Sequence, residues 1–102
     1  MDDVSIEEIH TIIENKQTAI LYFYTPLCGT CQVAGKMLSV VELMLPQIPF
    51  LQADLNYIPE AAELFKIESV PCLIVMVDGE MKEKIYAFQS VPYLHSIISQ
   101  YC

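Results

Sequence analysis

Two cysteines three positions apart are the residues of this chain best placed to do chemistry. Cys28 and Cys31 enclose Gly29 and Thr30, and the motif lies between an apolar strand pattern and a helical pattern. The first turn of a helix has unpaired N–H groups and a partial positive charge, which favour a thiolate. We therefore expect a depressed pKa for the Cys28 thiol, which makes it the attacking sulfur. Gly29 is expected to let the backbone turn tightly and leave that sulfur accessible. Cys31 is expected to be shielded but within disulfide reach.

A zinc site and inert packing are the alternatives to redox chemistry at this motif. A zinc site needs a second pair of ligands at suitable spacing. The remaining cysteines and histidines are dispersed and form no such pair: Cys72, Cys102, His10 and His95. We therefore favour a redox pair and expect no metal. Cys72 is interpreted as a buried strand residue, with a third thiol near the site as the alternative, and Cys102 as a residue without a role.

One helix and one strand are predicted before the motif. Residues 5–8 have the pattern of a capping box, and the isoleucines that follow at helical spacing predict an amphipathic helix ending near Lys16. Residues 19–24 are apolar without alternation and rich in aromatic and β-branched side chains. This composition indicates a central strand covered on both faces. Thr25 and Pro26 end that strand just before Cys28.

Helices and strands alternate after the motif. Three helices are predicted from the spacing of apolar residues, at residues 31–45, at residues 59–66 and from about Pro92 onward. Three strands are predicted, at residues 50–54, 72–77 and 81–88. The last two strands are joined by Asp78-Gly79, a strong hairpin signal. The order α-β-α-β-α-β-β-α predicts one α/β domain over residues 1–102, with a mixed sheet and helices on both faces.

Composition and charge exclude several classes of protein. The chain has 102 residues, is 54% hydrophobic and has only three glycines, which argues for a well-filled interior. Its net charge is −8 with no arginine, so it lacks the clustered basic residues that nucleic acids and anionic membranes require. No apolar run approaches the roughly 20 residues that cross a bilayer, and no secretory signal opens the sequence. We expect a monomer in the cytoplasm.

Four segments, taken together, resemble the thioredoxin family. The active-site segment of that family is similar to FYTPLCGTC at residues 23–31. The other three match the strand end after the active-site helix, the loop that faces the site, and the hairpin: Asp54-Leu55-Asn56, Ser69-Val70-Pro71 and Asp78-Gly79. These segments follow the order and spacing of the family from about residue 5 to residue 102.

The resemblance implies a fold, a mechanism and partners. The fold is the thioredoxin-like α/β fold, here with four strands, because too few residues precede Ser5 for the N-terminal edge strand. Val70-Pro71 is implied to be a cis bond beside Cys28, with the Val70 backbone free to pair with a substrate strand. Cys28 would attack a partner disulfide and Cys31 would resolve the mixed disulfide. No bound cofactor is needed, and electrons would come from a thioredoxin reductase or a low-molecular-weight thiol.

The chain departs from the family at four positions around the motif. Leu27 replaces a tryptophan, and with Pro26 and Val70 it would form an apolar surface for docking a partner segment. Thr30 replaces a proline, and its hydroxyl is expected to bond the Cys28 thiolate and make the pair less reducing. The buried Asp and Lys of the family become Tyr22 and Gln52, an uncharged replacement for a costly charge pair. This exchange leaves Cys31 without an obvious proton acceptor.

Three functions remain open from the sequence alone. The leading hypothesis is a protein thiol-disulfide oxidoreductase acting as a reductant. The second is a thioredoxin-fold binding module with weak redox activity, in which partner binding would survive substitution of Cys28 by serine. The third is a metal or iron–sulfur carrier using Cys28 and Cys31, with or without Cys72, which colour or metal content in anaerobically purified protein would reveal.

Overall fold

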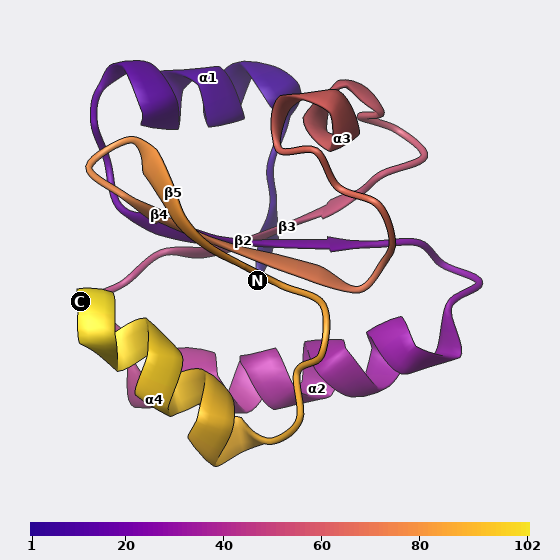
Figure 1. Ribbon diagram of the computed structural model, residues 1–102, viewed down its shortest axis with the longest axis vertical. Coiled ribbons are helices and arrows are strands. Elements are labelled where there is room, and N and C mark those ends of the chain that lie inside the picture. Colours follow the sequence, from indigo (N-terminus) through magenta and orange to yellow (C-terminus); the bar gives the residue numbers. More distant parts are fainter.

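A five-stranded mixed sheet between two layers of helices organises the chain in the computed structural model, which describes residues 1–102 (Figure 1). The strands are β1 (Asp2–Asp3), β2 (Ala19–Tyr24), β3 (Phe50–Asp54), β4 (Cys72–Val77) and β5 (Glu80–Ile85). The helices are α1 (Ile6–Glu14), α2 (Gly29–Met44), α3 (Glu60–Leu64) and α4 (Val91–Tyr101). The strand order across the sheet is β1-β3-β2-β4-β5.

The central strand β2 joins the parallel and antiparallel parts of the sheet. It pairs in parallel with β3 and antiparallel with β4, and β5 continues the sheet antiparallel to β4. Both β2 and β4 are almost entirely buried, which confirms the strands expected from their apolar runs. Strands covered on both faces need apolar side chains on both, so neither sequence alternates.

The expectation of four strands is wrong, because a short edge strand precedes α1. Asp2 and Asp3 pair in parallel with Leu51 and Gln52 of β3. The backbone N–H of Val4 donates to the Gln52 carbonyl at 2.9 Å, which extends the pairing. Two exposed acidic residues carry no apolar alternation, so this strand depends on the free edge of β3 rather than on a local signal.

Each face of the sheet is covered by its own pair of helices, so the core has two halves (Figure 1). Helices α2 and α4 cover one face, where the core includes Tyr22, Leu38 and Leu94. Helices α1 and α3 cover the other face, where it includes Ile9 and Phe23. Successive residues of a strand point to opposite faces, so neighbours on β2 belong to different halves.

Several element boundaries differ from those expected. Ser5 caps α1 through the expected capping box with Glu8, but the helix ends at Glu14 rather than near Lys16. Helix α2 begins two residues before Cys31, at Gly29, and α3 is shorter than residues 59–66. Strand β5 spans 80–85 rather than 81–88, because the chain turns before α4, where Gln89 has a φ of 57°.

The Asp78-Gly79 turn joins β4 to β5 as expected. Both residues have positive φ, 54° and 80°, which is the requirement of a tight two-residue hairpin. The turn is also packed under the end of α1, because the Gly79 N–H donates to the Gln17 carbonyl at 2.9 Å. The hairpin therefore fixes where β4 and β5 lie relative to the first helix.

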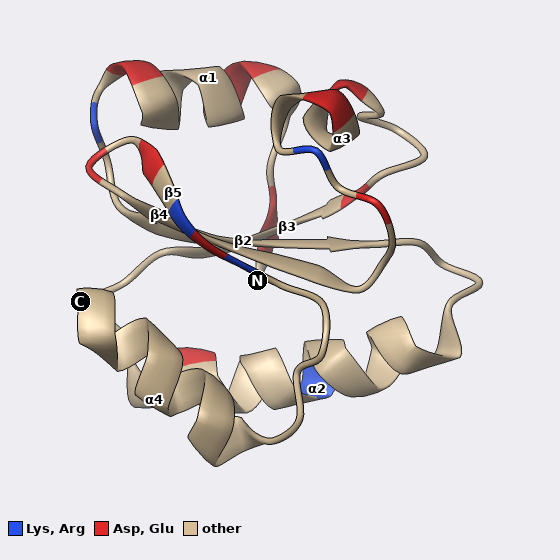
Figure 2. Ribbon diagram, viewed as in Figure 1, with Lys and Arg blue, Asp and Glu red and all other residues tan.

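Charged residues are sparse on the α2–α4 layer and more frequent on the sheet and on α1 and α3 (Figure 2). Helix α4 has none, and α2 has only Lys36 and Glu42, whose charges cancel. The net charge of −8 therefore comes from the rest of the chain. The helices of this fold are too short or too polar to cross a membrane.

Candidate active site

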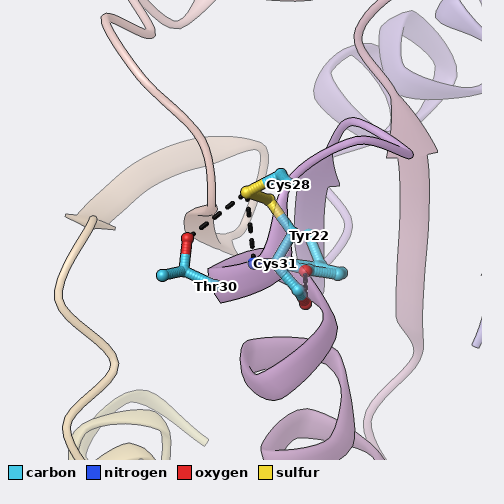
Figure 3. The surroundings of a disulfide bond; sticks show 4 residues. All are labelled: Tyr22, Cys28, Thr30 and Cys31. Carbon is cyan, nitrogen blue, oxygen red and sulfur yellow. Dashed lines mark hydrogen bonds between the residues drawn. A yellow bond between two sulfur atoms is a disulfide. The ribbon is translucent and has the colours of Figure 1, made fainter.

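Cys28 is both the cap of α2 and one partner of a disulfide. It is the N-cap residue of the helix, in extended conformation, and its sulfur is bonded to that of Cys31 (Figure 3). Their Cα atoms are 5.2 Å apart. Cys28 lies in the loop that follows the end of β2, and Cys31 lies in the first turn of α2. The structure therefore brings the two expected sulfurs together at a helix N-terminus, where negative charge is stabilised.

Two donors lie within hydrogen-bond distance of the Cys28 sulfur. The backbone N–H of Cys31 donates to it at 3.2 Å, and the Thr30 hydroxyl oxygen lies 3.3 Å from it (Figure 3). Both come from the first turn of α2, because Cys28 immediately precedes that turn. Hydrogen bonds to a thiolate are stronger than those to a neutral sulfur, so this arrangement stabilises the reduced, ionised form.

The surroundings of the two sulfurs differ. Cys31 is 3% exposed, whereas Cys28 is partly exposed and next to the exposed Gly29 and Thr30. Leu27 is fully exposed, and Pro26 is also exposed. Gly29 does not have a positive φ and has open space around it. The backbone there does not need a glycine, contrary to the expected tight turn.

Tyr22 lies directly under the first turn of α2. Its hydroxyl donates a buried hydrogen bond to the backbone carbonyl of Cys31 (Figure 3). Burial, followed by the nearby Tyr24, raises the pKa of Tyr22 to about 12. Gln52 pairs with Tyr22 in register and donates its side-chain amide to Asp3 at 3.2 Å. From the sequence, Tyr22 and Gln52 are only uncharged replacements for a charge pair. The hydrogen bond from Tyr22 to Cys31 was not predicted.

The Val70-Pro71 bond is cis, as the resemblance implied. Pro71 and Thr30 line one hollow of about 390 Å³ beside the motif. Its other walls come from α2 and from the segment between β5 and α4, at Val33, Ala34, Met37, Tyr86, Ala87, Phe88 and Gln89. No pattern in the sequence points to this segment, because its residues reach the motif only through the order of strands in the sheet.

Cys72 and Cys102 lie apart from the disulfide. Cys72 is completely buried among the residues of the α1–α3 half of the core, and burial raises the pKa of its thiol to about 12, although Lys84 opposes the shift. Cys102 is exposed at the last position. No group of three or more His, Cys, Asp or Glu side chains is arranged to hold a metal ion. The geometry therefore favours packing as the role of Cys72.

Comparison with known families and proteins agrees with this geometry. The family model described as Thioredoxin matches residues 3–100. The chain is 53% identical over 81 residues to the thioredoxin-like protein YusE of Bacillus subtilis, which covers 79% of this chain and 76% of that protein. It is 27% identical over 82 residues to a thioredoxin of Chlamydia trachomatis, with 80% of each chain covered.

Solved structures share the fold at lower sequence identity. Oxidised mitochondrial thioredoxin 3 of Saccharomyces cerevisiae superimposes with a TM-score of 0.86 at 20% identity, covering 98% of this chain and 94% of that one. Oxidised thioredoxin of Plasmodium falciparum superimposes with a TM-score of 0.85 at 22% identity, covering 99% and 97%. At these identities the likeness concerns the fold alone.

Proposed function

The chain belongs to the thioredoxin family and is a thiol-disulfide oxidoreductase, and from this premise we propose that Cys28 and Cys31 are its two redox thiols. The observation that carries the proposal is the pair of donors on the Cys28 sulfur, at 3.2 and 3.3 Å. These bonds and the helix N-terminus favour the thiolate of Cys28 over the thiol. Cys28 is then the nucleophile of the pair.

The exchange proceeds in two balanced steps. The Cys28 thiolate attacks one sulfur of a partner disulfide, forming a mixed disulfide and releasing the other sulfur as a thiolate that takes up a proton. Cys31 then loses its proton to water, and its thiolate attacks the Cys28 sulfur. The Cys28–Cys31 disulfide forms, and the second partner sulfur leaves reduced. Two electrons thus pass from this protein to its partner.

The rim of the site supports docking of a partner segment. Leu27 and Pro26 present exposed apolar surface beside the partly exposed Cys28. Pro71 lines the adjacent hollow, and we assign the Val70 backbone to pairing with the bound segment. Gly29 and Thr30 complete the loop over which that segment passes. The partners proposed are proteins that carry a disulfide.

Thioredoxin family members act on disulfide substrates together with a thioredoxin reductase. For this chain we propose such a reductase, or a low-molecular-weight thiol, as the electron donor. A monomer in the cytoplasm is the setting we propose, since the leading function requires only one chain and a reducing compartment. Size measurement in solution and fractionation of cells test these two points.

Trapping of the intermediate tests the assignment of the two thiols. Cys31→Ser is expected to accumulate a mixed disulfide with a protein disulfide such as that of insulin, because the second step is lost. Cys28→Ser is expected to form no mixed disulfide and to lose reductase activity. Cys72→Ala serves as the control, with activity retained. If Cys28→Ser retained full reductase activity, the assignment would be wrong, and partner binding without exchange would instead favour the binding module.

A further inference from the structure

Tyr22 is a polar side chain inside an otherwise apolar half of the core. It is 3% exposed, in the half that includes Ile20, Leu38 and Leu73. A buried hydroxyl is costly without a partner, and the one it has is the backbone carbonyl of Cys31. A carbonyl oxygen has two lone pairs, so it can accept this bond as well as a helical one. The bond joins β2 to the turn that holds the redox cysteine.

The ring of Tyr22 is held from several sides, which fixes its hydroxyl. It stacks on Tyr24 with ring centres 5.6 Å apart, and Phe88 meets it edge-on at 5.9 Å. A Cβ placed on Gly35 would lie 3.6 Å from the ring, so α2 passes close to the ring and leaves no room beyond ordinary contact there. The hydroxyl therefore keeps its direction toward Cys31.

Burial, more than neighbouring charge, keeps the Tyr22 phenol protonated as a hydrogen-bond donor. The titratable side chain that faces it is Tyr24 on its own strand, and Cys31 on α2 meets it through the backbone carbonyl. The remaining neighbours do not titrate: Gln52 on β3, Leu73 on β4, Phe88 before α4 and Leu94 on α4. With its pKa raised to about 12, the phenol stays protonated near neutral pH.

We propose that Tyr22 is a positioning residue for the resolving thiol: its hydrogen bond to the Cys31 carbonyl keeps the first turn of α2 in place while Cys31 attacks the mixed disulfide. The proposal rests on the assignment of Cys31 as the resolving thiol. The first step uses the Cys28 sulfur and the two donors beside it, and it does not require the Cys31 sulfur to approach. The second step needs Cys31 and Cys28 at bonding distance, and at that stage no disulfide joins them. The Tyr22 bond remains in that intermediate, so its effect belongs to the second step.

Substitution of Tyr22 by phenylalanine removes the hydroxyl and keeps the ring. Tyr24→Phe is the matched control, since it removes a hydroxyl from the same strand that has no hydrogen bond in the structure. Both variants react with a protein disulfide, and acid-quenched samples are analysed by mass spectrometry for free, mixed-disulfide and oxidised protein. This assay separates the rate of attack by Cys28 from the rate of resolution by Cys31.

Tyr22→Phe is expected to slow resolution about fivefold, as loss of one net hydrogen bond predicts, with attack unchanged. Tyr24→Phe is expected to change neither rate. The pH dependence of resolution near neutral pH should keep its shape in Tyr22→Phe, because the phenol does not titrate there. Equal slowing of both steps, no slowing, or an altered pH profile would each overturn the proposal. Failure of Cys31→Ser to trap a mixed disulfide would instead contradict the proposed function itself.

Discussion

Cys72 on β4 lies opposite Phe23 on β2, so its side chain belongs to the α1–α3 half of the core. Tyr22, the neighbour of Phe23, faces the other half and bonds Cys31. The sheet therefore separates the Cys72 thiol from the first turn of α2. Although Cys72 follows Pro71 directly in the sequence, its direction is set by strand alternation.

Cys72→Ala is expected to leave the rate of disulfide reduction and the potential of the Cys28–Cys31 pair unchanged. It should lower the free energy of unfolding by about 1–2 kcal/mol, because it leaves a small void in the core. Activity assays and urea unfolding measure these effects. In the reduced wild-type protein, an alkylating reagent should modify Cys72 only after unfolding. Rapid labelling of Cys72 in the folded protein would show that this thiol is accessible.

Stability is expected to fall at alkaline pH. Burial raises the pKa of Cys72 from 9.0 and of Tyr22 from 10.0, each to about 12. Above pH 9 the unfolded chain loses protons that the folded chain keeps, so ionisation favours unfolding. These two groups contribute fully to the free energy of unfolding at a pH below the pKa values that they have in the unfolded chain. The contribution is lost as the pH rises toward about 12. Urea unfolding across this range measures the decline, which should be shallower in Cys72→Ala.

Thr30→Val tests the hydroxyl beside the Cys28 sulfur. Valine has a similar shape but offers no hydrogen bond, so the reduced thiolate loses one of its two donors. Alkylation of Cys28 at neutral pH is expected to slow about threefold. The reduction potential should become more negative by about 15 mV, because the reduced form is less stabilised. Titration in thiol–disulfide buffers measures it. A shift toward less negative values would contradict the hydrogen bond.

The same titration of the wild-type protein gives its reduction potential, which can be compared with that of other redox proteins. With two donors on the Cys28 sulfur, we expect a potential less negative than about −270 mV, the value typical of thioredoxin. A value at or below about −270 mV would show that these bonds do not decide the potential. Absence of a reversible disulfide between Cys28 and Cys31 would remove the oxidoreductase assignment for these residues.

Gly79→Ala is expected to destabilise the fold, whereas Gly29→Ala is not. Gly79 has a φ of 80°, and a Cβ there would lie 2.5 Å from the carbonyl oxygen of Ile13. Alanine would strain the hairpin and displace the end of α1, at a cost of about 2–3 kcal/mol. Gly29 has open space, and alanine favours a helix. Thermal or urea unfolding compares the two, and equal stabilities would contradict the crowding at Gly79.

Features that depend on neighbours in the sequence were predicted correctly. The capping box at Ser5 and the Asp78-Gly79 hairpin each follow from a few adjacent residues. The helix at the cysteine motif does too, although it begins at Gly29 rather than at Cys31. The resemblance to the thioredoxin family added the cis bond at Pro71. Local signals of this kind act before tertiary structure forms, so they can be recognised in the sequence.

Features that depend on distant segments were not predicted. Strand β1 exists because the edge of β3 accepts Asp2 and Asp3, which carry no strand pattern of their own. The bond from Tyr22 to Cys31 forms because β2 and α2 pack together after the turn between them. Phe88 reaches the motif because β5 lies next to β4. Each of these contacts follows from the arrangement of the sheet rather than from spacing along the chain.

The absence of net charge from the α2–α4 layer makes the electric field of the protein unequal on the two sides of its sheet. The two helices of the α2–α4 layer carry no net charge, and the other acidic residues lie in the sheet, in α1 and α3 and in the loops (Figure 2). Over a Debye length of about 8 Å, this field turns an approaching protein before contact. A partner with a basic patch is therefore attracted to the side of the molecule away from α2 and α4.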